Sequence, residues 1–199
     1  MSYSKPAPTA ARRTRSAILA ALVVGAALTG LLGYQALAVS SSSATSPTLG
    51  QADGVVPDGV TVFDEEVPAV ANLDPELLGV LRQAATDAAG DGVELYVDSG
   101  WRSPEYQEQL LREAVSKYGS EEEAARWVAT ADTSAHVAGD AVDIGHADAT
   151  AWLSEHGAEY GLCQIYGNEP WHYELRPEAI EHGCPPVYAD ATHDPRMQR

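Results

Sequence analysis

The sequence predicts an α+β domain, in which a small, largely antiparallel β-sheet is flanked by helices. Three observations predict this class. Helices with clear start and stop signals alternate with short strands, these strands lack the β-α-β rhythm of a parallel sheet, and no glycine-rich phosphate loop occurs. The 199 residues are enough for one domain with a hydrophobic core and appended segments.

The first helix of the domain is expected over residues 75–90. Asp74 supplies the N-cap and Pro75 takes the first helical position, where its missing N–H costs nothing. Gly90 and Gly92 end the helix. Its apolar face repeats at helical spacing and consists of Leu77, Leu78, Leu81, Ala84, Ala85 and Ala88.

The remaining elements carry similar signals. Residues 93–100 alternate apolar and polar side chains, as a half-buried strand does. A second helix starts after Ser103 and ends at Gly119, and a third starts after Ser120, with Glu123 completing a capping box. The expected set is completed by a strand over 141–144, a fourth helix over 148–161, and strands over 162–166 and 171–175.

The charge distribution excludes one class of function. The chain has 12 Lys and Arg against 29 Asp and Glu, a net charge of −17, and no acid precedes Asp53. The body of the protein is therefore strongly acidic and repels phosphate backbones and anionic lipid. We expect no nucleic-acid partner.

Residues 1–39 are expected to form a cytoplasmic basic tail followed by a signal peptide or a membrane anchor. Lys5 and three arginines precede an apolar run with no charge from Ser16 to Val39. The Ala-Leu-Ala stretch at 36–38 has the small-x-small form of a cleavage site, but the run is also long enough to span a bilayer. Both alternatives place the body outside the cytoplasm.

The rest of the chain divides by composition. Residues 40–60 are rich in Ser, Thr, Pro and Gly and are expected to form a flexible tether. The folded domain is expected over 61–188 and a C-terminal tail over 189–199. Cys163 and Cys184 lie in the part expected outside the cytoplasm, where an even count favours a disulfide. Two free or metal-binding thiols are the alternative.

Two separated segments carry residue types that bind zinc. The stretch "SAHVAGDAVDIG" offers His136 and Asp143, with Gly139 letting the chain turn between them, and "EPWHYE" offers His172. A catalytic zinc site uses three such ligands and leaves one position open. The first stretch also fits a polar turn that leads into a strand, and a single buried histidine is more often a core residue. The residue chemistry leaves both interpretations open.

Two acids near His172 are candidates for a general base. Glu169 has the wrong parity for a continuous strand, but the proline after it interrupts the strand, so Glu169 can reach the site from a loop. Glu174 shares the parity of His172 and is the rival. The aromatic residues Trp171 and Tyr173 are expected to pack on one side of the strand while His172 faces the other.

These segments resemble the zinc D-alanyl-D-alanine carboxypeptidases of the VanY type, relatives of the VanX dipeptidases and of the Hedgehog signalling domain. The family pattern S-x-H-x-x-G-x-A-x-D is matched over 134–143, and the pattern E-x-W-H over 169–172. The stretch "SGWRSPEYQ" resembles the S-G-Y/W-R-S segment of the family. The three motifs occur in the family's order between about residues 75 and 176, which implies a Hedgehog/DD-peptidase-like fold.

The resemblance implies one zinc ion held by His136, Asp143 and His172. It also implies that Glu169 is the general base for the attacking water and that Arg102 stabilises the oxyanion at the scissile carbonyl. A surface ion pair is the alternative for Arg102.

Two further residues occupy positions that contact the C-terminal end of the substrate in the family. They are Gln107 and Ser134, for which a solvated helix position and a turn cap are the respective alternatives. The other histidines match no motif position and are expected in ordinary surface or loop positions; they are His146, His156, His182 and His193.

The implied function is that of a zinc D,D-carboxypeptidase outside a bacterial cytoplasmic membrane. Its substrate would be a peptidoglycan stem peptide ending in D-Ala-D-Ala, from which it removes the terminal D-Ala, and an uncleaved N-terminal segment would hold it at the membrane. One alternative is a cell-wall endopeptidase that cuts L-Ala–D-Glu with the same zinc site. Another is a non-catalytic Hedgehog-like zinc-binding module, against which Glu169 and Arg102 argue, because a structural site needs neither.

Overall fold

A computed structural model describes residues 48–198 of the chain. The signal peptide or membrane anchor predicted over 1–39 and the first part of the predicted tether, 40–47, lie outside the described residues. Within 48–198, none of the helices has the length and apolar character needed to cross a bilayer.

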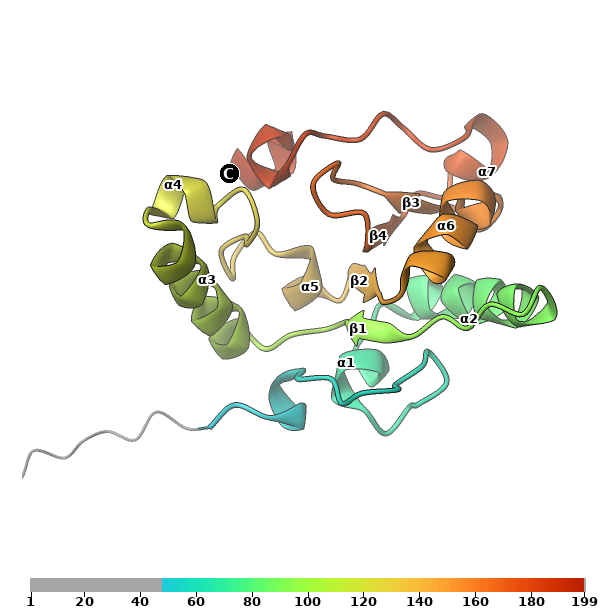
Figure 1. The fold of residues 1–199 in the computed structure, drawn as a ribbon, viewed down its shortest axis with the longest axis horizontal. Coiled ribbons are helices and arrows are strands. Elements are labelled where there is room, and N and C mark those ends of the chain that lie inside the picture. Colours follow the sequence, from blue (N-terminus) through green and yellow to red (C-terminus); the bar gives the residue numbers. More distant parts are fainter. Residues whose placement is uncertain (1–47, 199) are drawn as a thin grey trace, which may run out of the picture. The chain divides into compact units, whose positions relative to one another are not determined.

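The sheet of the domain has four antiparallel strands in the spatial order β1 (Val97–Ser99), β2 (Ala141–Ile144), β4 (His172–Leu175) and β3 (Leu162–Gln164) (Figure 1). This arrangement confirms the predicted α+β class. In the pairing of β2 with β4, Asp143 lies directly opposite His172. Because opposite residues of an antiparallel pair point to the same face of the sheet, this register brings two of the predicted zinc ligands together.

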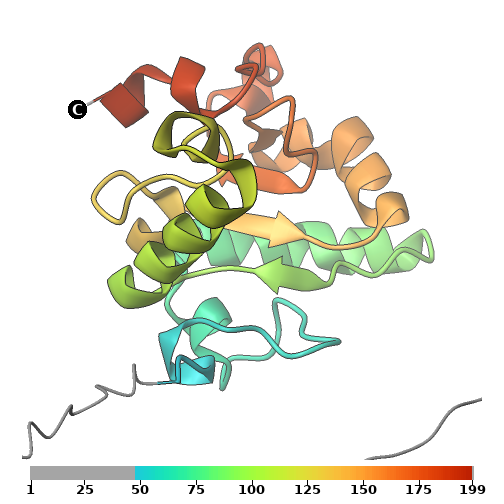
Figure 2. The ribbon, with the colours of Figure 1, turned by 60° about the vertical axis from the view of Figure 1, so that its left-hand side comes forward.

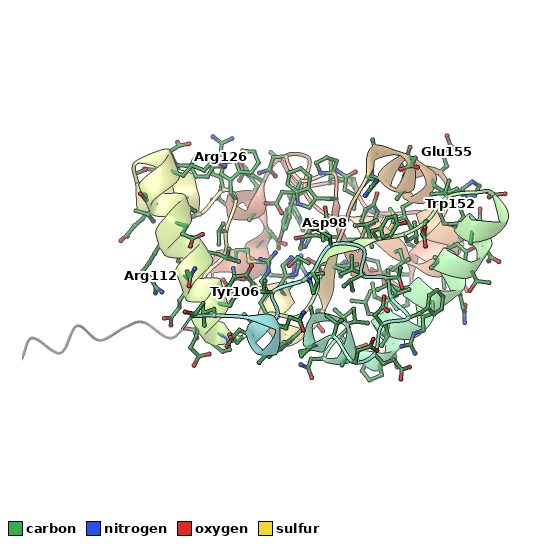
Figure 3. The ribbon with its side chains drawn as sticks, turned by 60° about the horizontal axis from the view of Figure 1, so that its bottom comes forward. Asp98, Tyr106, Arg112, Arg126, Trp152 and Glu155 are labelled. Carbon is green, nitrogen blue, oxygen red and sulfur yellow. A yellow bond between two sulfur atoms is a disulfide. The ribbon has the colours of Figure 1, made fainter. Side chains whose placement is uncertain are left out.

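The long helices begin where the sequence predicts. Helix α2 (Pro75–Gly90) is capped by the Asp74 carboxylate, which accepts hydrogen bonds from two backbone amides of the first turn. Helix α3 (Pro104–Tyr118) is capped by the Ser103 hydroxyl. Helix α6 (Ala147–His156) continues into a 3₁₀ turn, η2 (Gly157–Tyr160). Figure 3 shows Trp152 and Glu155 of α6 at the opposite end of the domain from Arg112 of α3.

Four shorter helices complete the described α-helices. They are α1 (Pro68–Ala71), α4 (Glu121–Ala124), α5 (Ala135–Ala138) and α7 (Ala179–His182). The predicted third helix is therefore much shorter than its capping box suggested, because the chain turns after Ala124. The predicted strand over 93–100 is shortened to β1, preceded by a single bridge between Thr61 and Tyr96.

The main hydrophobic core lies between the sheet and helices α2 and α6. Leu77 and Leu81 of α2 are fully buried in one cluster with Val142 and Tyr173 of the sheet and Leu153 of α6. Full burial of each such side chain contributes about 2 kcal/mol to folding. A second, smaller core packs beyond β3 and consists of Cys163, Ile165, Tyr166, Ala179 and Ala191.

The disulfide is present and links strand β3 to the segment after α7. Cys163 and Cys184 are bonded, with their Cα atoms 5.5 Å apart, and within 48–198 neither cysteine is free. The two cysteines are 21 positions apart in the sequence, and the loop between them contains β4 and His172. The covalent link thus encloses the segment that carries one predicted zinc ligand.

Both flanking segments pack on the domain more closely than their composition suggests. In the predicted tether, which includes η1 (Gln51–Asp53), the Asp53 carbonyl accepts a hydrogen bond from the Ser103 amide at 2.8 Å, and the Val60 carbonyl accepts one from the Val97 amide at 2.8 Å. In the predicted C-terminal tail, Asp194 is fully buried. That segment includes η3 (Ala191–His193) and η4 (Pro195–Gln198), and Figure 2 shows it, in red, beside α4.

Candidate metal and catalytic site

Helix α5 and the turn after it position the first two predicted ligands. Ser134 caps the helix, His136 lies in its first turn, and Gly139 ends it with φ +82°. A Cβ on Gly139 would lie 2.6 Å from the backbone oxygen of Asn72, so only glycine fits this turn. The chain then enters β2, which presents Asp143 toward His136.

Three predicted ligands converge in one place. Oδ1 of Asp143 lies 3.4 Å from Nε2 of His136 and 3.1 Å from Nδ1 of His172. The donor atoms of the three residues all lie within 4.8 Å of one another, and all three residues are buried. Two imidazoles and one carboxylate are a donor set that suits zinc, whose catalytic sites use three protein ligands. The residues therefore fit a single bound metal ion.

The protein orients both imidazole rings through their other nitrogen. Nδ1 of His136 donates to the carbonyl oxygen of Gly100 at 2.8 Å, because a carbonyl can only accept. Nε2 of His172 lies 3.3 Å from Oε1 of Glu174. Each ring thus has one nitrogen bonded to the protein and the other facing Asp143. Such outer contacts fix the tautomer and the ring direction of metal-binding histidines.

Burial and the neighbouring charged groups shift the pKa values of all three predicted ligands. Burial disfavours the charged form of His172, but hydrogen bonds to Asp143 and Glu174 outweigh it and raise the pKa of His172 to about 9. Burial, aided by the nearby Arg102, lowers the pKa of His136. Burial opposes the charged form of Asp143 too, yet the two histidines hold its pKa well below the usual range. Asp143 is therefore an anion at neutral pH, as a metal ligand must be.

Glu169 lies on the loop before β4, as its sequence position predicts. Its Oε2 is 3.9 Å from Nδ1 of His172, on the side of the ring that faces Asp143. Only 8% of the residue is exposed, and burial raises the pKa of its carboxyl to about 7. A buried carboxyl with a pKa near neutrality can both take up and release a proton under working conditions.

Glu174 has a different environment. It is 1% exposed, and its carboxylate accepts hydrogen bonds from Arg176 at 2.6 Å and from Arg196 at 2.6 Å and 3.2 Å. Although burial opposes ionisation, the hydrogen bonds from His172 and Arg196 hold the pKa of Glu174 far below its usual value. Glu174 is thus a fixed anion behind the ring of His172.

Arg102 contacts one of the predicted ligands and also lines the pocket beside them. Its guanidinium donates to Oδ2 of Asp143 at 3.0 Å, to the Ser99 hydroxyl at 2.8 Å and to the Gln107 side chain at 3.2 Å. A guanidinium has five N–H donors, so donors remain beyond these three contacts. Its partner is a predicted metal ligand instead of a surface acid.

Gln107 and Ser134 both line the same pocket, but their side chains are partly engaged within the protein. The amide of Gln107, which is 1% exposed, donates to the carbonyl of Ala129 at 2.8 Å. The hydroxyl of Ser134 accepts from the Val137 amide at 3.4 Å. Its hydroxyl proton is still available to an acceptor in the pocket.

A pocket of about 350 Å³ opens over these residues and continues along helix α3. Its lining includes the three predicted ligands, Glu169 and Arg102. The lining also includes Tyr118 and Trp127, whose rings stack with centroids 5.7 Å apart. The pocket therefore extends from the predicted ligands to an aromatic pair contributed by and beside helix α3.

The structure differs from the sequence-based expectations for the aromatic residues and agrees with them for the remaining histidines. Trp171 precedes β4 and is 39% exposed at the pocket, whereas Tyr173 is buried in the core, so the two aromatics do not share one packed side of the strand. The residues His146, His156, His182 and His193 lie outside the ligand cluster. No sequence motif signals Tyr118, Trp127 or Arg196, because they lie outside the segments 134–143 and 169–172 that carry the predicted ligands.

The sequence is similar to those of known D-alanyl-D-alanine carboxypeptidases. Residues 71–178 match the VanY family, described as D-alanyl-D-alanine carboxypeptidase. The chain is 31% identical over 140 residues to a D-alanyl-D-alanine carboxypeptidase of Enterococcus faecalis (strain ATCC 700802 / V583), which covers 56% of this chain and 52% of the relative. The chain thus spans about half the length of this curated relative.

Solved structures show the same similarity. One is a mutant of the vancomycin resistance D,D-pentapeptidase VanY from a VanB-type cassette, in complex with Zn(II), with 29% identity, a TM-score of 0.51, and coverage of 56% of this chain and 75% of that chain. Another is VanYB in complex with D-Alanine-D-Alanine, with the same identity and TM-score. A third is the LD-carboxypeptidase LdcB, with 26% identity, a TM-score of 0.51, and coverage of 66% of this chain and 72% of that chain.

Proposed function

The chain belongs to the VanY family of D-alanyl-D-alanine carboxypeptidases, and we propose from this premise that it is a zinc-dependent D,D-carboxypeptidase. Its proposed substrate is a peptidoglycan stem peptide ending in D-Ala-D-Ala, from which it removes the last residue. The observation that carries the proposal is the convergence of His136, Asp143 and His172 in a pocket that also contains Glu169.

The three converging residues are the proposed ligands of one zinc ion. Two imidazole nitrogens and the Oδ1 atom of Asp143 face a common point, and the other nitrogen of each ring is held by Gly100 or Glu174. A relative in this family has been solved in complex with Zn(II), which supports the choice of metal. Bound there, zinc supplies Lewis acidity at neutral pH.

Glu169 is the proposed general base and acid. Its carboxylate takes a proton from the attacking water and can return it to the amine of the departing D-Ala, so that the peptide bond is cleaved with no net change in the enzyme. Its position 3.9 Å from His172 and the raised pKa of its buried carboxyl support this role.

Arg102 is the proposed donor to the carbonyl oxygen that becomes negatively charged during the reaction. Its contacts with Asp143, Ser99 and Gln107 hold the guanidinium in place before substrate arrives, so little reorganisation is needed when charge develops. Gln107 and Ser134 line the same pocket, and we assign them to the C-terminal end of the substrate.

The substrate also determines where the enzyme works. Peptidoglycan lies outside the cytoplasmic membrane, and proteins that act on it are extracytoplasmic. The basic and apolar segment at 1–39 is the proposed route to that compartment, as a cleaved signal peptide or as a membrane anchor.

A second candidate activity is favoured by one comparison. LdcB, an LD-carboxypeptidase, shares the fold with a TM-score of 0.51 and 26% identity. An enzyme of that kind removes D-Ala from an L-configured neighbour, so it would shorten a tetrapeptide stem instead of a pentapeptide stem. The two activities differ in the configuration of the residue before the scissile bond.

One assay separates these activities. Zinc-loaded protein is incubated with pentapeptide and tetrapeptide stems, and the products are identified by mass spectrometry, with His172→Ala as the inactive control. We expect the pentapeptide to lose one D-Ala and the tetrapeptide to remain intact. Shortening of the tetrapeptide would identify an L,D-carboxypeptidase, and internal cleavage an endopeptidase. If the protein binds stoichiometric zinc and forms no product, it is a non-catalytic module.

A further inference from the structure

The segment 190–197, which we call the C-terminal strap, lies outside the part of the chain that matches the family, residues 71–178. By composition the strap belongs to a tail, yet in the structure its residues Ala191 and Asp194 are buried and Met197 lines the pocket of the proposed site. Figures 1 and 2 both show this segment returning to the side of the domain where α4 lies. The strap is therefore close enough to contribute to the site.

The first contact between the strap and the site runs through Glu174. The guanidinium of Arg196 forms a two-pronged contact with this carboxylate, with one nitrogen 2.6 Å from Oε2 and the other 3.2 Å from Oε1. Oε1 is also the atom that faces Nε2 of His172 at 3.3 Å. Arg196 is thus one residue removed from a proposed zinc ligand, although the two are 24 positions apart in the sequence.

The second contact runs through Tyr166. The buried carboxylate of Asp194 accepts a hydrogen bond from the Tyr166 hydroxyl at 3.2 Å and is also held by Arg196. The ring of Tyr166 packs against the ring of His172, with centroids 5.1 Å apart. The Asp194–Arg196 pair consequently supports His172 through two neighbours. Glu174 contacts the Nε2 atom of the His172 ring, and Tyr166 packs against the ring itself.

The chemistry of Glu174 explains why an arginine is needed there. A carboxylate that is 1% exposed is costly to bury unless cations and donors surround it. Arg176 contacts only Oε2, whereas Arg196 contacts both oxygens and so fixes the plane of the carboxylate. The direction of Oε1 in turn sets the orientation of the His172 ring, since outer carboxylates orient metal-binding histidines.

We propose that Arg196 is a positioning residue for the zinc ligand His172, and that the C-terminal strap is a working part of the metal site. The proposal rests on the zinc site of the proposed function, because it assigns to Arg196 the task of holding one ligand of that site. Arg196 is not expected to contact substrate or the reacting atoms.

The chain offers a matched control for this proposal. Arg126, labelled in Figure 3, also ties down the strap: its Nε donates at 2.9 Å to Asp190, a carboxylate that is 1% exposed. Arg126 has no contact with Glu174 among the described residues. Arg126→Gln therefore loosens the strap by the same chemical change as Arg196→Gln without reaching His172.

The test compares zinc affinity in the full chain, measured by competition with a chromophoric chelator, together with the visible spectrum of the cobalt-substituted proteins. We expect Arg196→Gln to weaken zinc binding by about 10- to 100-fold, as loss of an outer contact does in other metal sites, and to change the cobalt spectrum. Arg126→Gln should keep the zinc affinity and the cobalt spectrum of the unmodified chain, because Arg126, within the described part of the chain, has no contact with Glu174. Arg196→Lys, which keeps the charge but lacks the planar fork, should give an intermediate affinity.

Each result of these measurements either supports the proposed role of Arg196 or overturns it. Equal zinc affinity in Arg196→Gln and the unmodified chain overturns the proposal, and so does an equal loss in Arg126→Gln, since that would make the strap's role merely structural. If Arg196→Gln does not fold by circular dichroism, Arg196→Lys carries the test, and unmodified affinity in that variant overturns the proposal. Failure of the unmodified chain to bind stoichiometric zinc would refute the proposed function itself.

Discussion

Two buried carboxylates stand on opposite sides of His172, and their surroundings give them different roles. Glu169 lies near Nδ1 with no arginine bonded to it among the described residues, and burial raises the pKa of its carboxyl to about 7. Glu174 lies at Nε2, where Arg176 and Arg196 keep it an anion. When two carboxyls have different environments, the one with the raised pKa can carry a proton and the one with the lowered pKa stays charged. Of the two candidates for the general base, these environments therefore favour Glu169.

This assignment predicts the effects of two isosteric substitutions. Glu169→Gln keeps the shape but removes the basicity, so kcat should fall by about 10²- to 10⁴-fold while zinc remains stoichiometric. Glu174→Gln on zinc-saturated protein should stay within about tenfold of the unmodified kcat, because it acts only through His172. Both are measured in one assay with pentapeptide stems, with zinc content determined on the same samples. An inactive Glu174→Gln beside an active Glu169→Gln would reverse the assignment.

At the scale of elements, the short helix α5 and the turn at Gly139 set the spacing between two proposed ligands. Gly139 has φ +82°, and its neighbour across the turn is the backbone of Asn72. The Gly139 carbonyl also accepts a hydrogen bond from the Asp74 amide at 2.9 Å, which ties this turn to the start of α2. A change here should therefore disturb both folding and the site.

Gly119 provides the comparison for a substitution at Gly139. It ends α3 with φ +87°, and no atom lies within 4 Å of the point that a Cβ would occupy, so Gly119→Ala should cost about 1 kcal/mol for the left-handed conformation alone. In Gly139→Ala the new methyl group would clash with the backbone of Asn72, which must move. This substitution should therefore lower the free energy of unfolding by at least about 1 kcal/mol more than Gly119→Ala does, and it should also weaken zinc binding. Urea unfolding of both variants and zinc titration check this. Equal costs and unchanged zinc affinity would show that the turn has room to adjust.

The elements also show which parts of the fold are predictable from the sequence. Helices α2 and α3 are predicted correctly because Asp74 and Ser103 are caps next to a proline and a long periodic face. Helix α5 has four residues, too few to display a helical period, so only its glycine is visible in the sequence. The proposed ligands and Glu169 can be named from the sequence because they lie in two compact motifs, 134–143 and 169–172. Arg196 is missed because its contact with Glu174 depends on the path of the chain.

At the scale of the whole domain, composition locates the boundaries poorly. Residues 50–60 contain few large apolar side chains, yet their backbone carbonyls pair with the domain, and Gly54 lies so close to Trp101 that no side chain would fit. The strap similarly packs through two buried acids, Asp190 and Asp194, which pair with Arg126 and Arg196, whereas composition assigns charged residues to the surface. Contacts made by backbone and by ion pairs leave no hydrophobic pattern to detect.

The disulfide predicts how the whole domain responds to reduction. Cys163 and Cys184 close a loop that contains β4, so breaking the bond should lower the free energy of unfolding by about 3 kcal/mol and weaken zinc retention. Thermal unfolding with and without a reductant measures the first effect, and chelator competition the second. A variant with serine at both positions should resemble the reduced protein and should not respond to the reductant. A reduced protein as stable as the oxidised one would contradict this expectation.

The direct pairing of Asp143 with His172 across β2 and β4 has a consequence for how the molecule reaches its final form. If β4 slipped by one residue, Tyr173 would stand opposite Asp143, His172 would turn to the other face, and the chelating trio would not exist. A metal that binds only the correctly paired sheet lowers the free energy of that sheet alone, by mass action. Under the proposed function, zinc availability would thus select against mispaired chains, so that the catalytic ion also acts as a check on assembly.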